Sequence, residues 1–570
     1  MPCPNCLADR SVFVANEKKS TFYGGAAILM VGSILVKLIG AFYKIPLIKL
    51  LSDEAYTDFN TAYNVYNLFL TIATAGLPVA MSKMVSEANT LNRQNQISRI
   101  LSVALKAFLF MGLVSFVAMS VFAEPLAEAM GSASATWCVR CLSPSVLCVC
   151  VMAAFRGYYQ GHSDMVPTAV SQIIESLGKL VFGLALALGA LWLIPGAETY
   201  RQRLAAAGAI LGVSIGTAIA LAYIVSHYRK DRKTRKGHIY PDTPDSNGAT
   251  LSRLLTLAIP ITLGSAAISL VTIIDTSVVF DLLKQRFIDY PDLITSVAQD
   301  QALLEGGVDP VLYMAQGLKG IYDKCMAVYN LPCQLMVAIT ASIIPAVSAC
   351  LARRDLKGAS ATSESALRIG AILAFPMGLG LFALGGPVMD VVSLGSIDVA
   401  IAGPIMSILG LAAIFVCIMS LCNSILQANG RVGLPVIAVV AGGVVKIAVN
   451  YLLVSNYDIN ILGAPIGTLC CFGVVALLDI LFIRFTIPSP PSFLRAFAKP
   501  LAASGVMGAA AWAVYGLTGR FAGQKLGCLL GIAAGVVVYF VLIVLLRVFS
   551  KEDMKLMPKG DKIAKLLHIQ

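Results

Sequence analysis

The sequence of residues 34–47 is ILVKLIGAFYKIPL, and it lies in the first of many apolar runs long enough to cross a bilayer. Of the 570 residues, 58% are hydrophobic and only 13% are charged, and the mean hydropathy is +0.80. A soluble protein of this size carries about 25% charged residues. The sequence therefore predicts an all-α polytopic membrane protein.

Windowed hydropathy predicts about fourteen transmembrane helices. They are expected at 24–48, 60–82, 101–123, 138–158, 166–193, 204–227, 254–280, 318–349, 366–386, 402–427, 434–455, 463–485, 500–517 and 526–548. The first run has no small-residue cleavage pattern after a short apolar core, so it is expected to remain as a span.

The charged residues alternate in sign between successive loops. The segment 228–236, YRKDRKTRK, carries six basic residues against one Asp, whereas the next loop, 281–316, is acidic. By the positive-inside rule, both termini and every even-numbered loop are cytoplasmic. The net charge of +12 is therefore mainly a consequence of topology. A nucleic-acid binder would instead gather its basic residues on a soluble domain.

An internal repeat relates the two halves of the chain. The motif VYNL occurs at 65–68 and again at 328–331, and Lys179 and Lys446 later occupy matching positions. Repeats of six helices share one orientation, as in transporters whose two lobes enclose a central cavity. The predicted parts are an N-terminal tail (1–21), an N-lobe (22–227), a basic linker (228–253), a C-lobe (254–485), two further helices (486–549) and a C-terminal tail (550–570), with both tails and the linker cytoplasmic.

Two lysines lie inside the first predicted span. A charge at the centre of the bilayer costs about 3 kcal/mol, so it needs a cavity or a partner. Lys37 is near the predicted midplane, and Lys44, seven residues later, faces the same side of the helix. No carboxylate lies within four residues, so each partner is on another helix or is a ligand. Lys44 has the alternative of extending toward the outer interface.

The seventh and eighth spans carry further charges. Asp275 lies at a depth similar to that of Lys44, so an ion pair between them is one hypothesis, either as structural neutralisation or as a state-dependent gate. Lys324, beside Asp323, is expected to open the eighth span from the outer side. It is either a cavity cation or a solvated residue at the helix start.

The matching lysines of the two halves differ in their local partners. Glu175 precedes Lys179 by four residues, which favours a local ion pair over contact with a ligand. Lys446 has no such carboxylate. Asp479 is expected to pair with Arg484 at the end of the twelfth span.

The interior lysines outnumber the isolated carboxylates, which predicts an anionic substrate. Ammonium groups in a low-dielectric cavity attract phosphate or carboxylate. The chain has no GxxxxGK[ST] phosphate-binding loop, and its four histidines form no ligand or catalytic pattern. The sequence thus predicts a transporter with no catalytic residues, no metal and no cofactor.

The stretches VGSILVKLIGAFYKIPLIKLL (31–51) and AYNVYNLFLTIATAGLPVAMSKMVSEA (62–88) resemble the stage V sporulation protein B and polysaccharide flippase group. This group belongs to the multidrug/oligosaccharidyl-lipid/polysaccharide exporter superfamily and includes MurJ-like lipid II flippases. The resemblance implies two lobes and fourteen helices that turn over undecaprenyl-pyrophosphate-linked sugars. It also implies that Lys37, Lys44 and Lys324 match cavity arginines of MurJ-type proteins, and that Asp58 matches an acidic position before the second helix. The chain departs in having lysines, which lack bidentate phosphate geometry.

These observations predict a flippase for a polyprenyl-pyrophosphate-linked saccharide in the cytoplasmic membrane, with lipid II or a related cell-wall precursor as the leading candidate. Its partners would be this substrate and membrane lipid, with no nucleic acid, and its driver would be the membrane potential or a coupling ion. The alternatives are a cation-coupled multidrug antiporter, which needs acidic residues in the first helix, and an exporter of another polysaccharide repeat unit. A membrane scaffold would not need intramembrane lysines.

Overall fold

The computed structural model describes residues 32–548 apart from residues 33–34, 75, 163, 235–241, 295–308, 432 and 457–458. Throughout these ranges the regular structure is helical, which confirms the predicted all-α class. Eleven described segments are long and apolar enough to span a membrane, and they correspond to the predicted second to sixth and ninth to fourteenth spans. The count of fourteen stays a prediction, since the first span is only partly described and the helical segments 254–280 and 318–349 are not among these eleven. Both predicted tails, 1–21 and 550–570, lie outside the described residues.

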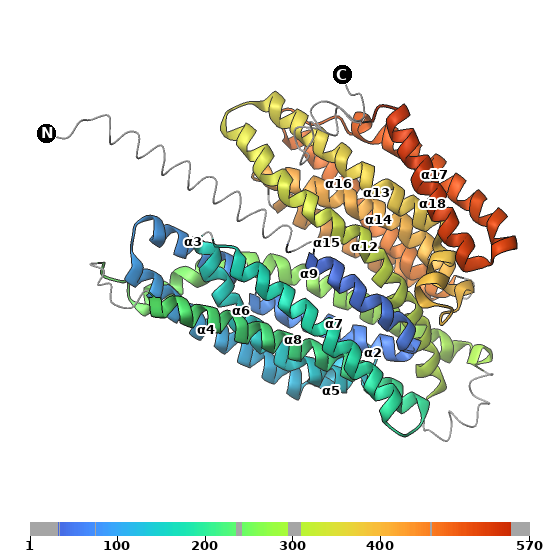
Figure 1. The fold of residues 1–570 in the computed structure, drawn as a ribbon, viewed down its shortest axis with the longest axis horizontal. Coiled ribbons are helices and arrows are strands. Elements are labelled where there is room, and N and C mark those ends of the chain that lie inside the picture. The colour runs from blue at the N-terminus through green and yellow to red at the C-terminus, as the bar shows by residue number, and fades with distance from the viewer. Residues whose placement is uncertain are drawn as a thin grey trace. The chain divides into compact units, whose positions relative to one another are not determined.

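The chain divides into two compact units, each described here by itself. Unit 1 comprises the described residues up to Tyr43 together with Asp58–Ile273. In it, α4 and α3 pack on α6, α6 packs on α8, and α7 lies along α8 (Figure 1). Its elements are the start of a helix at 35–50, α2 (Asp53–Thr74) from Asp58 onward, α3 (Leu77–Thr90), α4 (Gln94–Val121), α5 (Ala123–Ala129), η1 (Ala133–Ala135), α6 (Thr136–Gly161), α7 (Val166–Leu193), α8 (Glu198–Thr234) and the first part of α9 (Asn247–Asp289).

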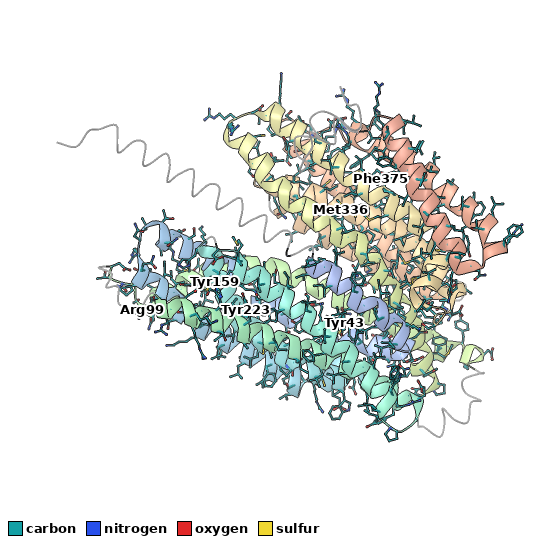
Figure 2. All side chains as sticks on the ribbon, viewed as in Figure 1. Tyr43, Arg99, Tyr159, Tyr223, Met336 and Phe375 are labelled. Carbon is teal, nitrogen blue, oxygen red and sulfur yellow. The ribbon has the colours of Figure 1, made fainter. Side chains whose placement is uncertain are left out.

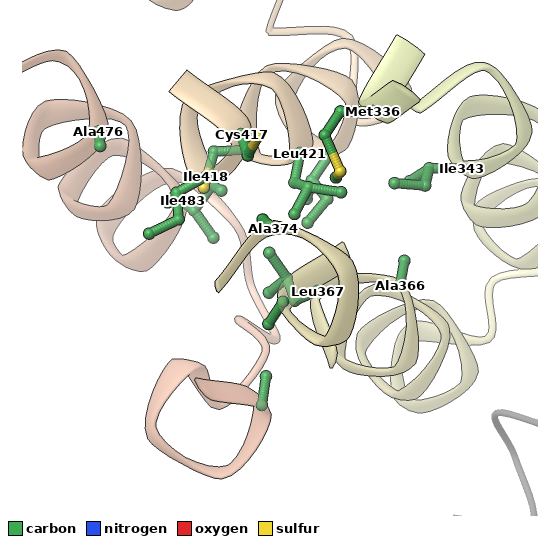
Figure 3. Close-up of a cluster of buried hydrophobic side chains, with 14 of the residues drawn as sticks. Met336, Ile343, Ala366, Leu367, Ala374, Cys417, Ile418, Leu421, Ala476 and Ile483 are labelled. Atoms are coloured by element: carbon green, nitrogen blue, oxygen red, sulfur yellow. The ribbon is translucent and has the colours of Figure 1, made fainter. Parts of the chain in front are cut away.

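Unit 2 comprises Lys44–Thr57 and the chain from Ile274 onward. Its core is a cluster of apolar side chains from α12, α13, α14 and α16, among them Met336, Leu367 and Leu421 (Figure 3). Besides the ends of helix 35–50 and α9 and the start of α2, its elements are η2 (Pro291–Ile294), α12 (Pro310–Ala352), α13 (Leu356–Ser393), α14 (Val399–Ala428), α15 (Gly433–Val454), η3 (Asn460–Leu462), α16 (Gly463–Thr486), α17 (Phe493–Ala522) and α18 (Gln524–Leu545).

The helices of the two units share one pattern of neighbours. In unit 1, α3, α4 and α6 pack on one another, α8 packs on α6, and α7 packs on α8. In unit 2, α12, α13 and α14 pack on one another, α16 packs on α14, and α15 packs on α16. This correspondence follows the order of the sequence repeat and agrees with two pseudo-symmetric lobes. The last two helices, α17 and α18, pack on each other and on α13, outside the repeat.

The predicted second span is interrupted near Gly76. The span expected over 60–82 is present, but two helices form it: α2 ends at Thr74, and α3 begins at Leu77 with a proline in its first turn. Gly76 donates a backbone hydrogen bond to Thr262 Oγ1 at 3.2 Å. A Cβ at Gly76 would lie 2.0 Å from Ala258 O, so only glycine allows this approach to α9. By contrast, the predicted break between 158 and 166 is confirmed.

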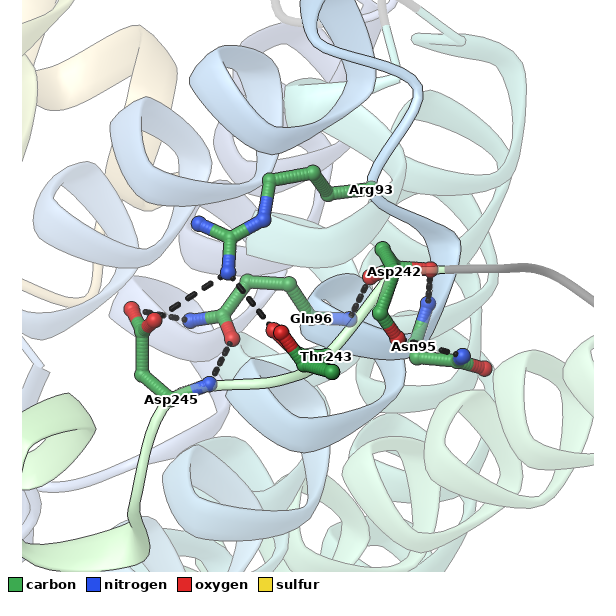
Figure 4. Close-up of polar contacts among 6 residues, drawn as sticks. All are labelled: Arg93, Asn95, Gln96, Asp242, Thr243 and Asp245. Atoms are coloured by element: carbon green, nitrogen blue, oxygen red, sulfur yellow. Dashed lines mark hydrogen bonds and ion pairs between the residues drawn. The ribbon is translucent and has the colours of Figure 1, made fainter.

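The chain that leads into α9 is tied to the start of α4 within unit 1. Asp242 caps α4, since its carboxylate accepts the backbone N–H groups of Asn95 at 3.1 Å and Gln96 at 3.0 Å (Figure 4). Asp245 accepts from the Gln96 side chain at 3.0 Å and forms an ion pair with Arg93 at 3.1 Å. This polar network fixes the described end of the predicted linker to the turn between α3 and α4.

Candidate functional site

In unit 1, charged and aromatic side chains of helix 35–50 interact with Lys179 of α7. Lys37 is exposed and lies close enough to Lys179 for the two ammonium charges to interact. The Lys179 Nζ atom stands 5.9 Å from the centre of the Tyr43 ring, a cation–π contact. The Tyr43 side chain is buried, and its hydroxyl donates to Ala209 O at 2.9 Å (Figure 2 labels Tyr43). The aromatic ring beneath Lys179 is thereby held in place.

The partner of Glu175 is an arginine that the sequence reasoning missed. Among the described residues Glu175 forms an ion pair with Arg156 of α6 at 3.0 Å, and the Glu175 charge also acts on Lys179. The local pairing of Glu175 with Lys179 stays a prediction. Arg156 Nε also donates to Ser171 Oγ at 3.0 Å. The planar guanidinium donates to both acceptors of α7 through two separate nitrogen atoms, Nε and Nη2. Arg156 lies near the end of a predicted span, where a basic side chain normally extends to the interface.

In unit 2, the matching lysine is neutralised by a carboxylate. Lys446 Nζ lies 2.6 Å from Asp275 Oδ2, and Asn450 Nδ2 donates to Asp275 Oδ1 at 2.6 Å. The exposed fractions of the Lys446 and Asp275 side chains are only 14% and 10%. The sequence-based hypothesis paired Asp275 with Lys44. In the structure Asp275 pairs with Lys446 instead. Lys44 itself is half-buried.

The Lys446–Asp275 pair is enclosed by close helix packing. Tyr322 OH and Thr468 Oγ1 share a hydrogen bond of 3.1 Å, and the Tyr322 hydroxyl interacts electrostatically with Lys446. A Cβ at Gly467 would lie 2.0 Å from Asn450 Oδ1, so a larger residue there would displace the Asn450 side chain. The pair is thus part of a packed interior.

Lys324 is buried and paired, so of its two predicted roles the solvated residue at a helix start is wrong. The helix begins earlier, at Pro310, with Asp309 as its N-cap. Lys324 is only 1% exposed, and its Nζ atom lies 2.8 Å from both Asp53 Oδ1 and Leu51 O. A second buried pair, Lys319 with Asp323 at 3.5 Å, lies on the same helix. In this structure Lys324 is therefore part of an internal ion pair of unit 2.

Two acidic residues have roles that the sequence did not indicate. Asp58 is buried and accepts hydrogen bonds from Ser132 and Ser134, in the turn before α6. Asp479 is fully buried, and neither of its carboxylate oxygens has a hydrogen-bond partner among the described residues. The expected pair with Arg484 is wrong, because five residues rotate the side chain onto another face of α16, where Arg484 is exposed.

An apolar cavity of about 660 Å³ lies within unit 2 between α12, α13, α17 and α18. Its walls are almost wholly apolar, and they include Pro332, Leu384, Met507, Gly535, Tyr539 and Ile543. Such a lining suits a hydrocarbon chain rather than a sugar or a phosphate. In the part of the chain that the structure describes, no three His, Cys, Asp or Glu side chains are grouped to hold a metal ion.

The two units therefore differ in local charge balance. In unit 1, Glu175 is paired with Arg156, and the charges of Glu175 and Lys37 both act on Lys179, so three cations share one carboxylate. In unit 2, Lys446 and Lys324 each have a carboxylate of their own. The surplus of positive charge in unit 1 can bind an anion, with ammonium groups acting as point charges toward phosphate.

Comparison with known proteins agrees with this architecture. The family model described as "Polysaccharide biosynthesis protein" matches residues 22–351, and the one described as "Lipid II flippase MurJ" matches residues 313–553. Stage V sporulation protein B of Bacillus subtilis (strain 168) is 24% identical over 95% of this chain and 98% of its own. Lipid II flippase MurJ of the same organism is 24% identical over 78% and 79%. A solved structure of lipid II flippase MurJ, in an inward closed conformation, shares the fold, with a TM-score of 0.65 and 17% identity over 91% of this chain and 98% of that one.

Proposed function

The chain belongs to the polysaccharide biosynthesis protein family and is a multi-span membrane transporter, and we propose that it flips a polyprenyl-pyrophosphate-linked saccharide across the cytoplasmic membrane. Lipid II or a related cell-wall precursor is the leading substrate, because a MurJ family model and a MurJ relative both match the chain. Both termini would be cytoplasmic, as the alternation of charge between loops predicts.

The observation that carries the proposal is the excess of positive charge in unit 1. Lys37 of helix 35–50 and Lys179 of α7 lie close enough for their charges to interact, and the nearby carboxylate of Glu175 is engaged by Arg156. Keeping two neighbouring ammonium groups within a membrane protein is costly unless an anion offsets them. A pyrophosphate supplies that charge, and we propose Lys37 and Lys179 as its first contacts.

The other three predicted substrate contacts, Lys44, Lys324 and Lys446, have different proposed roles. Lys446 and Lys324 would serve as internal ion pairs in the state described by the structure, since a phosphate would have to displace Asp275 or Asp53 to reach them. Lys44 stays a proposed contact. The apolar cavity of unit 2 offers a place for part of the polyprenyl chain, because its walls carry almost no polar atoms.

Complementation tests the proposed substrate. In cells depleted of their own lipid II flippase, the intact protein is expected to restore growth and lipid II translocation. A matched strain that expresses the protein with both Lys37 and Lys179 replaced by alanine is expected to fail, although the variant inserts normally. If well-expressed intact protein does not restore translocation, the peptidoglycan substrate is wrong and another polyprenyl-linked glycan takes its place.

A further inference from the structure

A cationic pocket lies at one end of unit 2 and is distinct from the apolar cavity. It has a volume of about 480 Å³ and is formed by the first turns of α17, the N-terminal half of α13 and the residues that follow α18. Its basic residues are Arg368, Arg495, Lys499 and Arg547. The loop-charge pattern predicts that this end of the bundle is cytoplasmic.

The charge of this pocket is poorly balanced. Its one acidic residue, Glu364, is already paired with Arg368 at 3.0 Å, and both side chains are largely buried. Among the described residues, no carboxylate forms an ion pair with Arg495, Lys499 or Arg547, and all three are exposed. Arg495 and Lys499 are one helical turn apart, so they lie on the same face of α17. The positive-inside rule explains why basic residues lie at the cytoplasmic end of the helices. It does not explain why Arg495, Lys499 and Arg547 line the same pocket.

The backbone after α18 is shaped to bring Arg547 to this pocket. Arg547 has a φ of 45°, a left-handed conformation that is usually taken by glycine at the end of a helix. Val548 N then bonds back to Ile543 O at 3.2 Å, and Lys499 Nζ donates to Arg547 O at 3.3 Å. Arg354 at the end of α12 has a similar left-handed conformation, with a φ of 58°, so this conformation sets the position of Arg547 and is not by itself a sign of binding.

The surroundings of the pocket are those of a membrane interface. Leu494, which also lines the pocket, is 80% exposed. On the inner side, Val548 packs against Ile372 and Ile543, two residues that line the apolar cavity of unit 2. A ligand here would have its anionic group among the basic side chains and apolar chains along the exposed leucine. That combination of charge and exposed apolar surface fits an amphiphile.

We propose that this pocket binds the phosphate of an anionic membrane phospholipid. Basic pockets between transmembrane helices on the cytoplasmic side are suited to anionic headgroups, and arginine holds phosphate oxygens in a bidentate geometry. The bound phosphate would link α13, α17 and the end of α18. Since these helices also form most of the apolar cavity, the lipid stabilises the shape of that cavity.

The test compares lipid binding by the purified full-length protein and two double variants. Native mass spectrometry and thermal unfolding are measured with phosphatidylglycerol, phosphatidylcholine or inorganic phosphate. We expect phosphatidylglycerol to bind and to raise the unfolding temperature, and its affinity to fall about tenfold or more in Arg495→Ala/Lys499→Ala. The matched control, Arg353→Ala/Arg354→Ala, removes two exposed charges from the end of α12, outside the pocket, and should bind as the wild type does.

Each other outcome contradicts the proposal in a distinct way. Unchanged phosphatidylglycerol affinity in Arg495→Ala/Lys499→Ala removes the pocket as its site. An equal loss in the control pair indicates general surface attraction instead. If inorganic phosphate stabilises the protein as well as the lipid does and displaces it, the ligand is a soluble phosphate. The variant Arg495→Lys/Lys499→Arg keeps both charges and should retain binding. Its binding would show that the loss in the alanine variant comes from the missing charges and not from misfolding.

Discussion

Replacing Lys37 with alanine is expected to lower transport of a lipid-linked pyrophosphate by roughly tenfold to a hundredfold. A hydrogen bond to a charged group contributes about 1.5–3 kcal/mol, and 1.4 kcal/mol corresponds to a factor of ten. Lys37 is exposed and its charge acts on Lys179, so its loss removes part of the positive charge without opening a packed core. The measurement is the rate of lipid II translocation in cells that express only the variant.

Two further variants make the Lys37 result interpretable. Lys37→Arg keeps the charge and can hold phosphate oxygens in a bidentate geometry, so it is expected to retain transport. Lys49→Ala removes an exposed lysine from the other end of the same helix and should leave transport unchanged. Equal loss in Lys49→Ala would show that the helix tolerates no lysine replacement, and normal transport in Lys37→Ala would remove Lys37 from the proposed site.

Replacing Asp275 with alanine is expected to destabilise the protein by about 3–5 kcal/mol. Breaking a buried ion pair by removing one partner leaves an uncompensated charge, and the cost is much larger than the net contribution of the intact pair. Here the uncompensated group is Lys446, with 14% of its side chain exposed, and Asn450 also loses its acceptor. Thermal or chemical unfolding of the purified protein measures the loss.

The matched variant removes both charges. Asp275→Ala/Lys446→Met is expected to recover most of the lost stability, because replacing a whole buried pair by apolar groups is often neutral or stabilising. A double-mutant cycle with the single Lys446→Met variant then gives the coupling energy of the pair. A coupling below about 0.5 kcal/mol would mean that the two side chains act independently, contrary to the contact of 2.6 Å.

The helical class and most spans were predictable because bilayer thickness imposes long apolar runs. The partners of the charged residues were not, since these depend on which helices pack together. Asp275 could be assigned a depth from the sequence, but its pairing with Lys446 follows from the approach of α9 to α15, which lie far apart in the chain. Likewise Arg156 meets Glu175 only because α6 and α7 fold back on each other.

Some missed features did have a signal in the sequence. The dipeptide Asp309–Pro310 is a helix start, with an N-cap acceptor followed by a proline in the first turn. It would have placed Lys324 about four turns inside α12, where a buried charge needs a partner. In the same way, Gly76 before Pro78 marks the break between α2 and α3. Helix-boundary residues such as these, rather than hydropathy, determine where the helices begin and end.

The most direct test of the central claim is translocation by the purified protein in proteoliposomes. Vesicles that contain lipid II are assayed for the fraction accessible from outside before and after a membrane potential is imposed. The account predicts protein-dependent translocation that is fast in the wild type and in Lys49→Ala, and strongly reduced in Lys37→Ala. If neither lipid II nor another polyprenyl-pyrophosphate-linked saccharide moves faster than in empty vesicles, the chain is not a flippase for this class of lipid.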